Sequence, residues 1–202
     1  MQAKISSEFI VKTLQLKRIG RKTAFKIFEG LKFNISDDQE LFEFLLECKN
    51  QIKLPDISQK DFDSAKTKYD QIVELNDKND IKMMSCFDAN YPKLLNEIDD
   101  KPIVFCYVGN YDIINTLPAV AIIGTRNPSL VGEKVGERFG EIFGERGFNV
   151  VSGLAIGCDA YAHKGCLTAN GSTTAIMAHG LDKIYPKENR DLGTQIMEGN
   201  GL

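Results

Sequence analysis

The sequence predicts an α/β protein in which a parallel sheet with helices on both faces is preceded by a small all-helical domain. Helical periodicity runs through residues 1–80, and no alternating strand pattern appears before Ile81. After Ile81, short apolar runs alternate with helical stretches, which is typical of parallel sheets covered by helices. The polar stretch 77–80 separates the helical pattern from the alternation of strands and helices. We therefore expect one domain over residues 1–80 and another over residues 81–202.

Apolar side chains recur at helical spacing in the first domain and predict helices there. Asp37 or Asp38 is positioned to cap the third helix, and Ser58 the fourth, because side-chain oxygens of these residue types accept the free N–H groups of a first helical turn. The apolar residues on the expected helices are Phe9, Val11, Leu14 and Leu16, then several within residues 23–31, then Leu41, Phe42, Phe44, Leu45 and Leu46, and finally Phe62, Ala65, Tyr69, Ile72 and Val73.

The second domain is expected to alternate strands with helices. Apolar runs predict strands at residues 103–108, 119–123, 148–152 and 173–178. Helical stretches lie between or after them, near residues 130–146, 159–169 and 188–198.

Glycine recurs every four residues in one expected helix, at Gly132, Gly136, Gly140 and Gly144. Each glycine in a helix interior costs about 1 kcal/mol relative to alanine, so the repeat needs a reason. We expect close packing of this helix against its sheet or a neighbouring helix. An interface between subunits is the alternative.

Composition excludes several classes of protein. No run of ~18 apolar residues occurs, so we expect no membrane-spanning helix and no membrane partner. Residues 1–8 are polar and lack the apolar core of a signal peptide, so a cytoplasmic protein is expected. The five cysteines include no CxxC pair, which argues against a disulfide framework or a zinc site.

The net charge of -3 argues against binding to a polyanion, but the charge is unevenly distributed. Residues 1–34 hold eight Lys or Arg and two Glu, a local charge of +6. Residues 35–80 carry a local charge of -6, and residues 81–202 one of -3. The basic N-terminal segment is therefore a candidate surface for polyanions, and a solvated helix face is the alternative.

Two glycine-containing loops, residues 124–129 and 152–159, directly follow predicted strands. In a parallel sheet such loops leave the carboxyl ends of the strands, where ligands bind. Each loop leads into a helix whose first N–H groups favour anions. Arg126 adds a permanent charge with a fork that matches phosphate oxygens, although an exposed surface arginine is the alternative. The sequence thus predicts a phosphate site.

Common catalytic and nucleotide-binding motifs are absent. The chain has no GxGxxG, GxxxxGK[ST] or GxSxG, which disfavours ordinary NAD binding, a P-loop and a nucleophile elbow. His163 lies four residues after Asp159, and such a pair could act as a general base. We favour a loop-bracing role, with Asp159 capping the helix and binding backbone N–H groups. No catalytic residue, metal ion or cofactor is expected.

The order of motifs over residues 88–202 resembles the DNA-processing protein A (Smf) family. The matching residues are Tyr91, Pro92, Lys93, Leu94, Leu95, Asp100, Lys101, Pro102, Gly109 and Asn110; residues 120–126 and Pro128; residues 152–155, Gly157, Asp159, Ala162, His163 and Gly165; and Gly171, Thr173, Ala175, residues 180–182, Tyr185, Pro186, Asn189 and Arg190.

This resemblance implies a Rossmann-like domain that binds single-stranded DNA without hydrolysing it. It also implies that the protein protects incoming DNA during natural transformation, loads the RecA recombinase and forms a homodimer. Family members continue beyond the equivalent of Leu202 through further strands and a basic motif. We therefore expect an incomplete domain, either a shortened form or a natural fragment.

The resemblance also assigns candidate site residues. Gly124, Thr125 and Arg126 would hold one backbone phosphate. The remaining candidates are Ser152, Gly153 and Gly157 in the adjoining wall and the nearby cations Lys164 and Lys183. The chain departs from the family at Ile156, where a basic residue is usual, and at Cys158 and His179. Loss of the basic residue is expected to weaken phosphate contact.

A looser resemblance covers residues 16–24, LKRIGRKTA, which are similar to a degenerate helix-hairpin-helix of a SAM-like domain. That motif offers backbone N–H groups to a DNA phosphate. Here Arg18 replaces the usual first glycine, and Gly20, Arg21 and Lys22 complete the candidate contacts. A purely structural helical domain is the alternative.

Two other functions compete with single-stranded DNA binding. One is a nucleotide-binding or phosphoribohydrolase-like enzyme of the related lysine-decarboxylase-like group, whose PGGxGTxxE motif is absent from this sequence. The other is a regulatory module that no longer binds DNA. Release of product from AMP distinguishes the first, and capture of RecA without DNA distinguishes the second.

Overall fold

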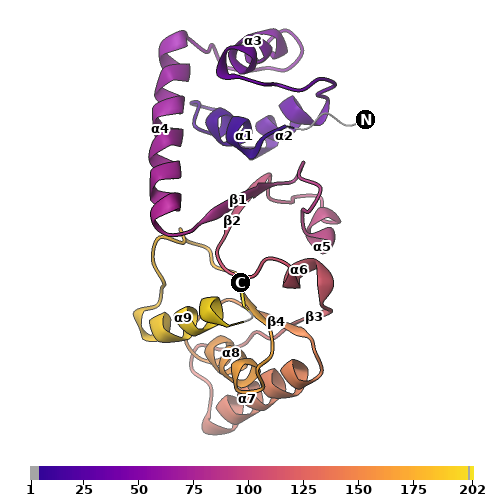
Figure 1. Cartoon of the computed structure of the whole chain (residues 1–202), viewed down its shortest axis with the longest axis vertical. Coiled ribbons are helices and arrows are strands. Elements are labelled where there is room, and N and C mark those ends of the chain that lie inside the picture. The colour runs from indigo at the N-terminus through magenta and orange to yellow at the C-terminus, as the bar shows by residue number, and fades with distance from the viewer. Residues whose placement is uncertain (1–4, 200) are drawn as a thin grey trace. The chain divides into compact units, whose positions relative to one another are not determined.

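The computed structural model describes residues 5–199 and 201–202, and the chain divides into two compact units, Met1–Cys106 and Tyr107–Leu202 (Figure 1). The expected domain boundary near residue 80 lies within the first unit, between the last long helix of the N-terminal part and the first strand. It therefore coincides with a change of secondary structure, and the boundary between the compact units lies further along the chain.

Helices dominate the first unit. They are α1 (Ser7–Leu14), α2 (Arg21–Glu29), α3 (Asp38–Cys48), α4 (Gln59–Lys78) and the short α5 (Lys93–Asn96). Asp37 caps α3, and Ser58 forms a capping box with Asp61 at the start of α4, as the sequence predicts for these caps. Ile10 and Leu41 are fully buried in the core that α1, α3 and α4 share. The helical N-terminal part is thus confirmed.

A two-stranded sheet joins β1 (Lys82–Ser85) to β2 (Val104–Tyr107). The apolar run at residues 103–108 does form a strand, but it pairs with β1 and not with the parallel sheet. The sequence did not predict β1, whose four residues have no alternating pattern.

The second unit contains a parallel sheet of β3 (Ala119–Ala121), β4 (Asn149–Ser152) and β5 (Thr173–Ala175), in that spatial order. The helices are α6 (Ile113–Thr116), α7 (Leu130–Glu145), α8 (Cys158–Thr168) and α9 (Arg190–Glu198), with a 3-10 turn η1 at Lys187–Asn189. The α/β fold class with a parallel sheet is therefore confirmed. No helix among residues 5–199 is both long and apolar enough to cross a membrane.

Helices α7 and α8 cover the central strand. Val150 is fully buried between Phe143 of α7 and Ala162 and Cys166 of α8. Along β3, Ala121 points to the opposite face and is exposed. In the part of the chain that the structure describes, the helix cover of β3 and β4 thus lies on the Val150 face.

The glycine repeat brings the backbones of α7 and α8 together. A Cβ atom at Gly140 would lie 2.1 Å from the carbonyl oxygen of Ala162, and one at Gly165 would lie 1.9 Å from the carbonyl oxygen of Glu137. Figure 1 shows these helices side by side. The close-packing interpretation is confirmed, because glycines of the repeat serve a contact within the chain.

The outer side of β5 is hydrogen-bonded to Leu202. The N–H of Leu202 donates to Thr173 over 3.1 Å, and its carbonyl accepts from Ala175 over 2.8 Å. The sheet edge at β5 is therefore paired at these residues.

Candidate phosphate-binding site

The two predicted loops meet at one edge of the parallel sheet. Residues 122–129, here called the first loop, follow β3, and residues 153–157, the second loop, follow the neighbouring β4. The N–H of Cys158 donates to the carbonyl oxygen of Thr125 over 3.1 Å. The structure thus brings Gly124, Thr125 and Arg126 together with Gly157, as the sequence predicts.

Gly157 allows this close approach. Its φ of +90° lies in a region that L side chains rarely adopt, and a Cβ atom there would lie 2.4 Å from the carbonyl oxygen of Thr125. Gly124 is crowded as well, since its Cβ atom would lie 2.6 Å from Sγ of Cys158. Gly157 thus lets the backbones of the two loops approach each other, and Gly124 leaves room for the Cys158 side chain.

Hydrogen-bond donors at this edge are unoccupied. Among the described residues, the backbone N–H groups of Gly124, Thr125 and Arg126 donate to no acceptor, and neither do those of Ile156 and Gly157. These donors come from both loops at their point of contact. Free N–H groups that converge from successive residues are a common anion-binding arrangement.

Arg126 supplies the full positive charge of the site. Its side chain is exposed and forms no ion pair with any residue in the described ranges. The first loop is held in place by the Thr125 hydroxyl, which accepts the N–H of Asn127, and by Ser129, which caps α7. Because these hydrogen bonds fix the loop, the unpaired guanidinium of Arg126 can donate two parallel hydrogen bonds to the oxygens of a phosphate.

Asp159 braces the second loop. One carboxylate oxygen accepts the N–H groups of Gly153 and Ala155 over 3.1 and 3.4 Å. Asp159 does not cap α8 as expected, because the N-cap position belongs to Gly157, which has no side chain to offer. The Asp159 carboxylate therefore fixes the backbone of the second loop, and the N–H of Cys158 at the start of α8 donates to Thr125 of the first loop.

His163 is part of the interior and not of the site edge. Its Nδ1 lies 2.6 Å from Oγ1 of Thr173, which itself donates to the carbonyl oxygen of Val150. The threonine oxygen therefore accepts from Nδ1–H, and the ring links α8 to β5. Burial lowers the pKa of His163 to about 4, against a smaller opposing effect of the Asp159 charge.

The alternative of a general-base pair is not supported, since Asp159 and His163 are not hydrogen-bonded to each other and each has a different partner. A general base must reach the proton that it removes from a substrate, and His163 is fully buried. Both side chains instead hold neighbouring elements together.

Ser152 and Gly153 shape the site without facing a ligand. Ser152 is nearly fully buried, and its hydroxyl donates to the carbonyl oxygen of Ile122 over 2.6 Å, which ties the end of β4 to the start of the first loop. A Cβ atom at Gly153 would lie 2.8 Å from the Asp159 carboxylate, so only glycine leaves room for that brace.

The two further candidate cations have partners of their own. Lys164 belongs to the second turn of α8, where its Nζ lies 5.3 Å from the centre of the Tyr161 ring. Lys183 is exposed, and its Nζ is 3.8 Å from Asp182. Among the described residues, neither forms a hydrogen bond or an ion pair with the first or second loop.

A third loop, residues 176–186, follows β5 at the same edge of the sheet, and the sequence analysis assigned only Lys183 of this loop to the site. The His179 ring lies near two carbonyl oxygens, with Nδ1 2.9 Å from Gly180 and Nε2 3.3 Å from Tyr185. Ile176 at the start of this loop is 66% exposed, and Ile156 of the second loop is 45% exposed. Apolar residues stand near the ends of two predicted strands, at Ile156 and Ile176, and this pattern could have indicated that the third loop borders the same edge as the second.

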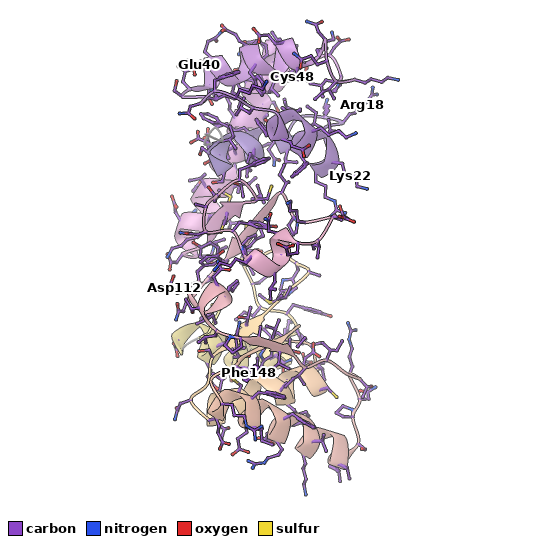
Figure 2. The ribbon with its side chains drawn as sticks, turned by 90° about the vertical axis from the view of Figure 1, so that its right-hand side faces the viewer. Arg18, Lys22, Glu40, Cys48, Asp112 and Phe148 are labelled. Carbon is purple, nitrogen blue, oxygen red and sulfur yellow. The ribbon has the colours of Figure 1, made fainter. Side chains whose placement is uncertain are left out.

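The N-terminal candidates belong to the first unit. Arg18 has a φ of +64° in the turn before α2, at the position where the helix-hairpin-helix resemblance implies glycine. Gly20 is the N-cap of α2 and provides no side-chain cap. Arg21 is paired with Asp100 over 2.5 Å, whereas Lys22 is exposed. Figure 2 shows Arg18 and Lys22 at one edge of the first unit.

Comparison with known proteins places these features in a family. The family model described as DNA recombination-mediator protein A matches residues 82–202. Protein Smf of Synechocystis sp. is 40% identical over 129 residues, which are 62% of this chain and 32% of that protein. DNA processing protein DprA of Streptococcus pneumoniae is 40% identical over 108 residues, 54% of this chain and 38% of that one. Protein Smf of Borreliella burgdorferi is 29% identical over 194 residues, which cover 92% of this chain and 57% of that protein.

Two solved structures are similar in fold. The X-ray structure of DNA processing protein A from Streptococcus pneumoniae has a TM-score of 0.58 at 28% identity and covers 91% of this chain and 65% of that chain. DNA processing protein A from Helicobacter pylori, described for its single-stranded DNA binding mode, has a TM-score of 0.53 at 28% identity over 59% of this chain and 53% of that one. The chain thus spans between about a third and just over half of the length of the curated relatives named above.

Proposed function

Because the chain belongs to the DNA recombination-mediator protein A family, we propose that its second unit binds single-stranded DNA at the loops that follow β3 and β4. The strand is held by its backbone phosphates. Arg126 provides the charge, and the N–H groups of Gly124 and Thr125 provide uncharged donors around it.

One observation carries this proposal. Gly157 lets the second loop approach the backbone of Thr125, so that free N–H groups from both loops lie beside an exposed and unpaired Arg126. Donors of this kind match the oxygens of a phosphate and carry no information about base sequence. We therefore expect binding that tolerates any base sequence and weakens with salt.

The site is proposed to bind and not to catalyse. Asp159 and His163 are engaged in holding the second loop and β5, which leaves neither in position to activate a nucleophile. Incubation with AMP tests the rival phosphoribohydrolase function. Release of adenine and ribose 5-phosphate would contradict the proposal, whereas intact AMP is expected.

The direct test is a titration of fluorescein-labelled oligonucleotides followed by anisotropy. We expect single strands of unrelated base sequence to bind alike, and the matched duplex to bind more weakly. A duplex preference, or a strong dependence on base sequence, would contradict phosphate recognition on a single strand.

We further propose that the bound strand is protected and passed to the RecA recombinase, and that the protein acts as a homodimer. The DNA recombination-mediator family supports the first part. RecA filament formation on single-stranded DNA coated with single-strand-binding protein measures this step, and light scattering measures the mass in solution. No acceleration of filament formation, or a monomer at all concentrations, would contradict the respective parts.

A further inference from the structure

We propose that the third loop carries a stacking site for a nucleobase on the ring of Tyr185. The inference rests on the proposed function, because the base would belong to the strand whose phosphate the first loop binds. It adds a contact of a different chemical kind. The contacts proposed for the first and second loops are all with phosphate oxygens, and none is with a base.

The backbone around Tyr185 is tied to the second loop. The side-chain amide of Asn189 donates to the carbonyl oxygen of Leu154 over 2.9 Å. Ile184, the residue before Tyr185, packs on the buried cluster to which Leu154 belongs, and Pro186, the residue after it, is buried. The position of Tyr185 is therefore fixed relative to the second loop, which supplies some of the free N–H groups of the phosphate site.

The side chain of Tyr185 is nevertheless open to solvent. It is 69% exposed, although the residues on both sides of it are packed. The His179 ring stands at 88° to the Tyr185 ring, with the ring centres 6.0 Å apart, and Nε2 of His179 lies 3.3 Å from the carbonyl oxygen of Tyr185. An aromatic surface that is already positioned loses little conformational freedom when a ligand stacks on it.

The surroundings of Tyr185 favour a nucleobase as the ligand. Exposed apolar side chains occur singly on most proteins, but a second one, Ile176, is 66% exposed at the start of the same loop. The N–H of Ile176 donates to the carbonyl oxygen of Ser152 over 2.8 Å, which holds the start of the third loop at the end of β4. Proteins that bind single strands combine cations for the backbone with aromatic rings for the bases. Arg126 and Tyr185 provide both kinds of group on loops at one edge of the sheet.

A short strand is long enough to reach both loops. The first loop follows β3 and the third follows β5, and these strands lie on either side of β4. Two strand spacings amount to about 10 Å. At about 3.4 Å per nucleotide of a stacked strand, roughly three or four nucleotides cover this separation. A phosphate at Arg126 and a base on Tyr185 can therefore belong to the same strand, a few nucleotides apart.

Stacking on Tyr185 also gives a physical reason for preferring single strands. In a duplex each base is paired and stacked between its neighbours, and exposing its face requires that these interactions be broken. Phosphates are present in single strands and duplexes alike, so contacts with phosphates alone discriminate weakly. A contact with the face of a base is available only in the single strand.

Two probes that share their phosphates and differ in their bases test the proposal on the full chain. They are fluorescein-labelled oligo-dT of about 15 nucleotides and a strand of the same length built from abasic residues. Tyr185→Ala removes the ring, and Tyr185→Phe keeps it. Phe139→Ala is the matched control, because Phe139 is a 50% exposed aromatic residue of the same unit that lies on α7 and not on a loop of the site. Circular dichroism confirms folding.

Wild type should bind oligo-dT about tenfold more tightly than the abasic strand, because stacking of one base contributes roughly this factor or more. Tyr185→Ala should lose about tenfold on oligo-dT and nothing on the abasic strand. Its slope of log affinity against log salt should stay unchanged, since no phosphate contact is lost. Tyr185→Phe and Phe139→Ala should behave like wild type. Unchanged binding of oligo-dT by Tyr185→Ala, or equal losses on the two probes, would overturn the proposal.

A measurement on the wild-type protein does not depend on how the variants fold. 2-Aminopurine, whose fluorescence falls when the base stacks, is placed at successive positions of the oligo-dT. Binding should lower the fluorescence at one or more positions, and Tyr185→Ala should abolish this decrease. A rise in fluorescence at every position of the wild-type complex would show that no base stacks on the protein.

Arg126→Ala separates this inference from the proposed function. If both hold, this variant should bind the two probes more weakly by the same factor and keep its preference for oligo-dT. If Arg126→Ala binds like wild type while Tyr185→Ala loses the preference for oligo-dT, the phosphate site fails and the stacking site stands. If Arg126→Ala is weakened and Tyr185→Ala is not, the stacking site fails and the phosphate site stands.

Discussion

Gly157 passes so close to Thr125 that a Cβ atom on the glycine would lie 2.4 Å from the threonine carbonyl oxygen. Two loops that follow separate strands meet at this point, and the N–H of Cys158 closes the contact by donating to the same oxygen. The glycine adopts a φ of +90° to do so. This close approach of Gly157 to Thr125 brings the free backbone N–H groups of the two loops to the same part of the sheet edge.

Gly157→Ala should therefore separate the loops. The new methyl group meets backbone atoms that cannot rotate away, and the left-handed backbone adds strain of roughly 1–3 kcal/mol. We expect single-stranded DNA affinity to fall about tenfold, as for the loss of a charge-assisted contact. The control is Gly147→Ala, which has a φ of +75° but nothing within 4 Å of its Cβ position. Equal affinity of the two variants would show that the loop approach is not needed.

Alanine substitutions at two successive glycines of α7, which packs on α8, should change the free energy of unfolding differently. Gly140→Ala places a methyl group 2.1 Å from the carbonyl oxygen of Ala162, and we expect it to lower the free energy of unfolding by about 2 kcal/mol or more. At Gly136 the Cβ atom would lie 3.4 Å from its nearest neighbour, so Gly136→Ala should be neutral or stabilising by up to about 1 kcal/mol. Urea unfolding measures both. Similar effects of the two changes would contradict the observed packing.

Buried His163 should make stability depend on pH. Its folded pKa of about 4 lies below the ordinary 6.5, so the unfolded chain binds more protons between these values. The stabilisation is fully present above about pH 6.5 and is lost as the pH falls towards 4, by up to about 3 kcal/mol.

Urea unfolding of wild type and His163→Gln over this pH range measures the effect of His163. The difference between the two free energies of unfolding should change with pH, because all other groups titrate in both proteins. A constant difference would show that His163 is not held in its neutral form.

Ile156 is 45% exposed on the second loop, at a position where the resemblance described in the sequence analysis implies a basic residue. Ile156→Lys should add a phosphate contact, strengthen single-stranded DNA binding several-fold and raise the salt slope by about 0.7. Ile98→Lys, at an exposed position of the first unit, is the control for added charge. If both variants gain equally, Ile156 does not adjoin the bound strand.

Much of the fold could be predicted because local signals agree with tertiary structure. The caps at Asp37 and Ser58 and the apolar periodicity locate the helices, and glycine loops after apolar runs locate the edge of the parallel sheet. The short β1 gives no such signal, since Lys82–Ser85 has no alternation and depends on its partner β2 for definition.

Side-chain roles at the site were harder to predict, because they depend on contacts between elements. The spacing of Asp159 and His163 left a paired role open beside the favoured bracing role, and the structure shows that His163 bonds to Thr173 of β5. Ser152 ends β4 at the sheet edge where a ligand-binding serine could lie, yet its hydroxyl donates to the carbonyl oxygen of Ile122. The role predicted for Arg126 is compatible with the structure, since Arg126 forms no ion pair with any described residue.

The most direct measurement is the salt dependence of single-stranded DNA binding by wild type, Arg126→Ala and Arg126→Lys, followed by fluorescence anisotropy with circular dichroism to confirm folding. Arg146→Ala, an exposed arginine at the other end of α7 without an ion pair among described residues, is the matched control. Arg126→Ala should weaken binding roughly tenfold to a hundredfold and lower the salt slope by about 0.7, and Lys should restore only part of the affinity. A folded Arg126→Ala with wild-type affinity and slope would contradict phosphate binding at this site.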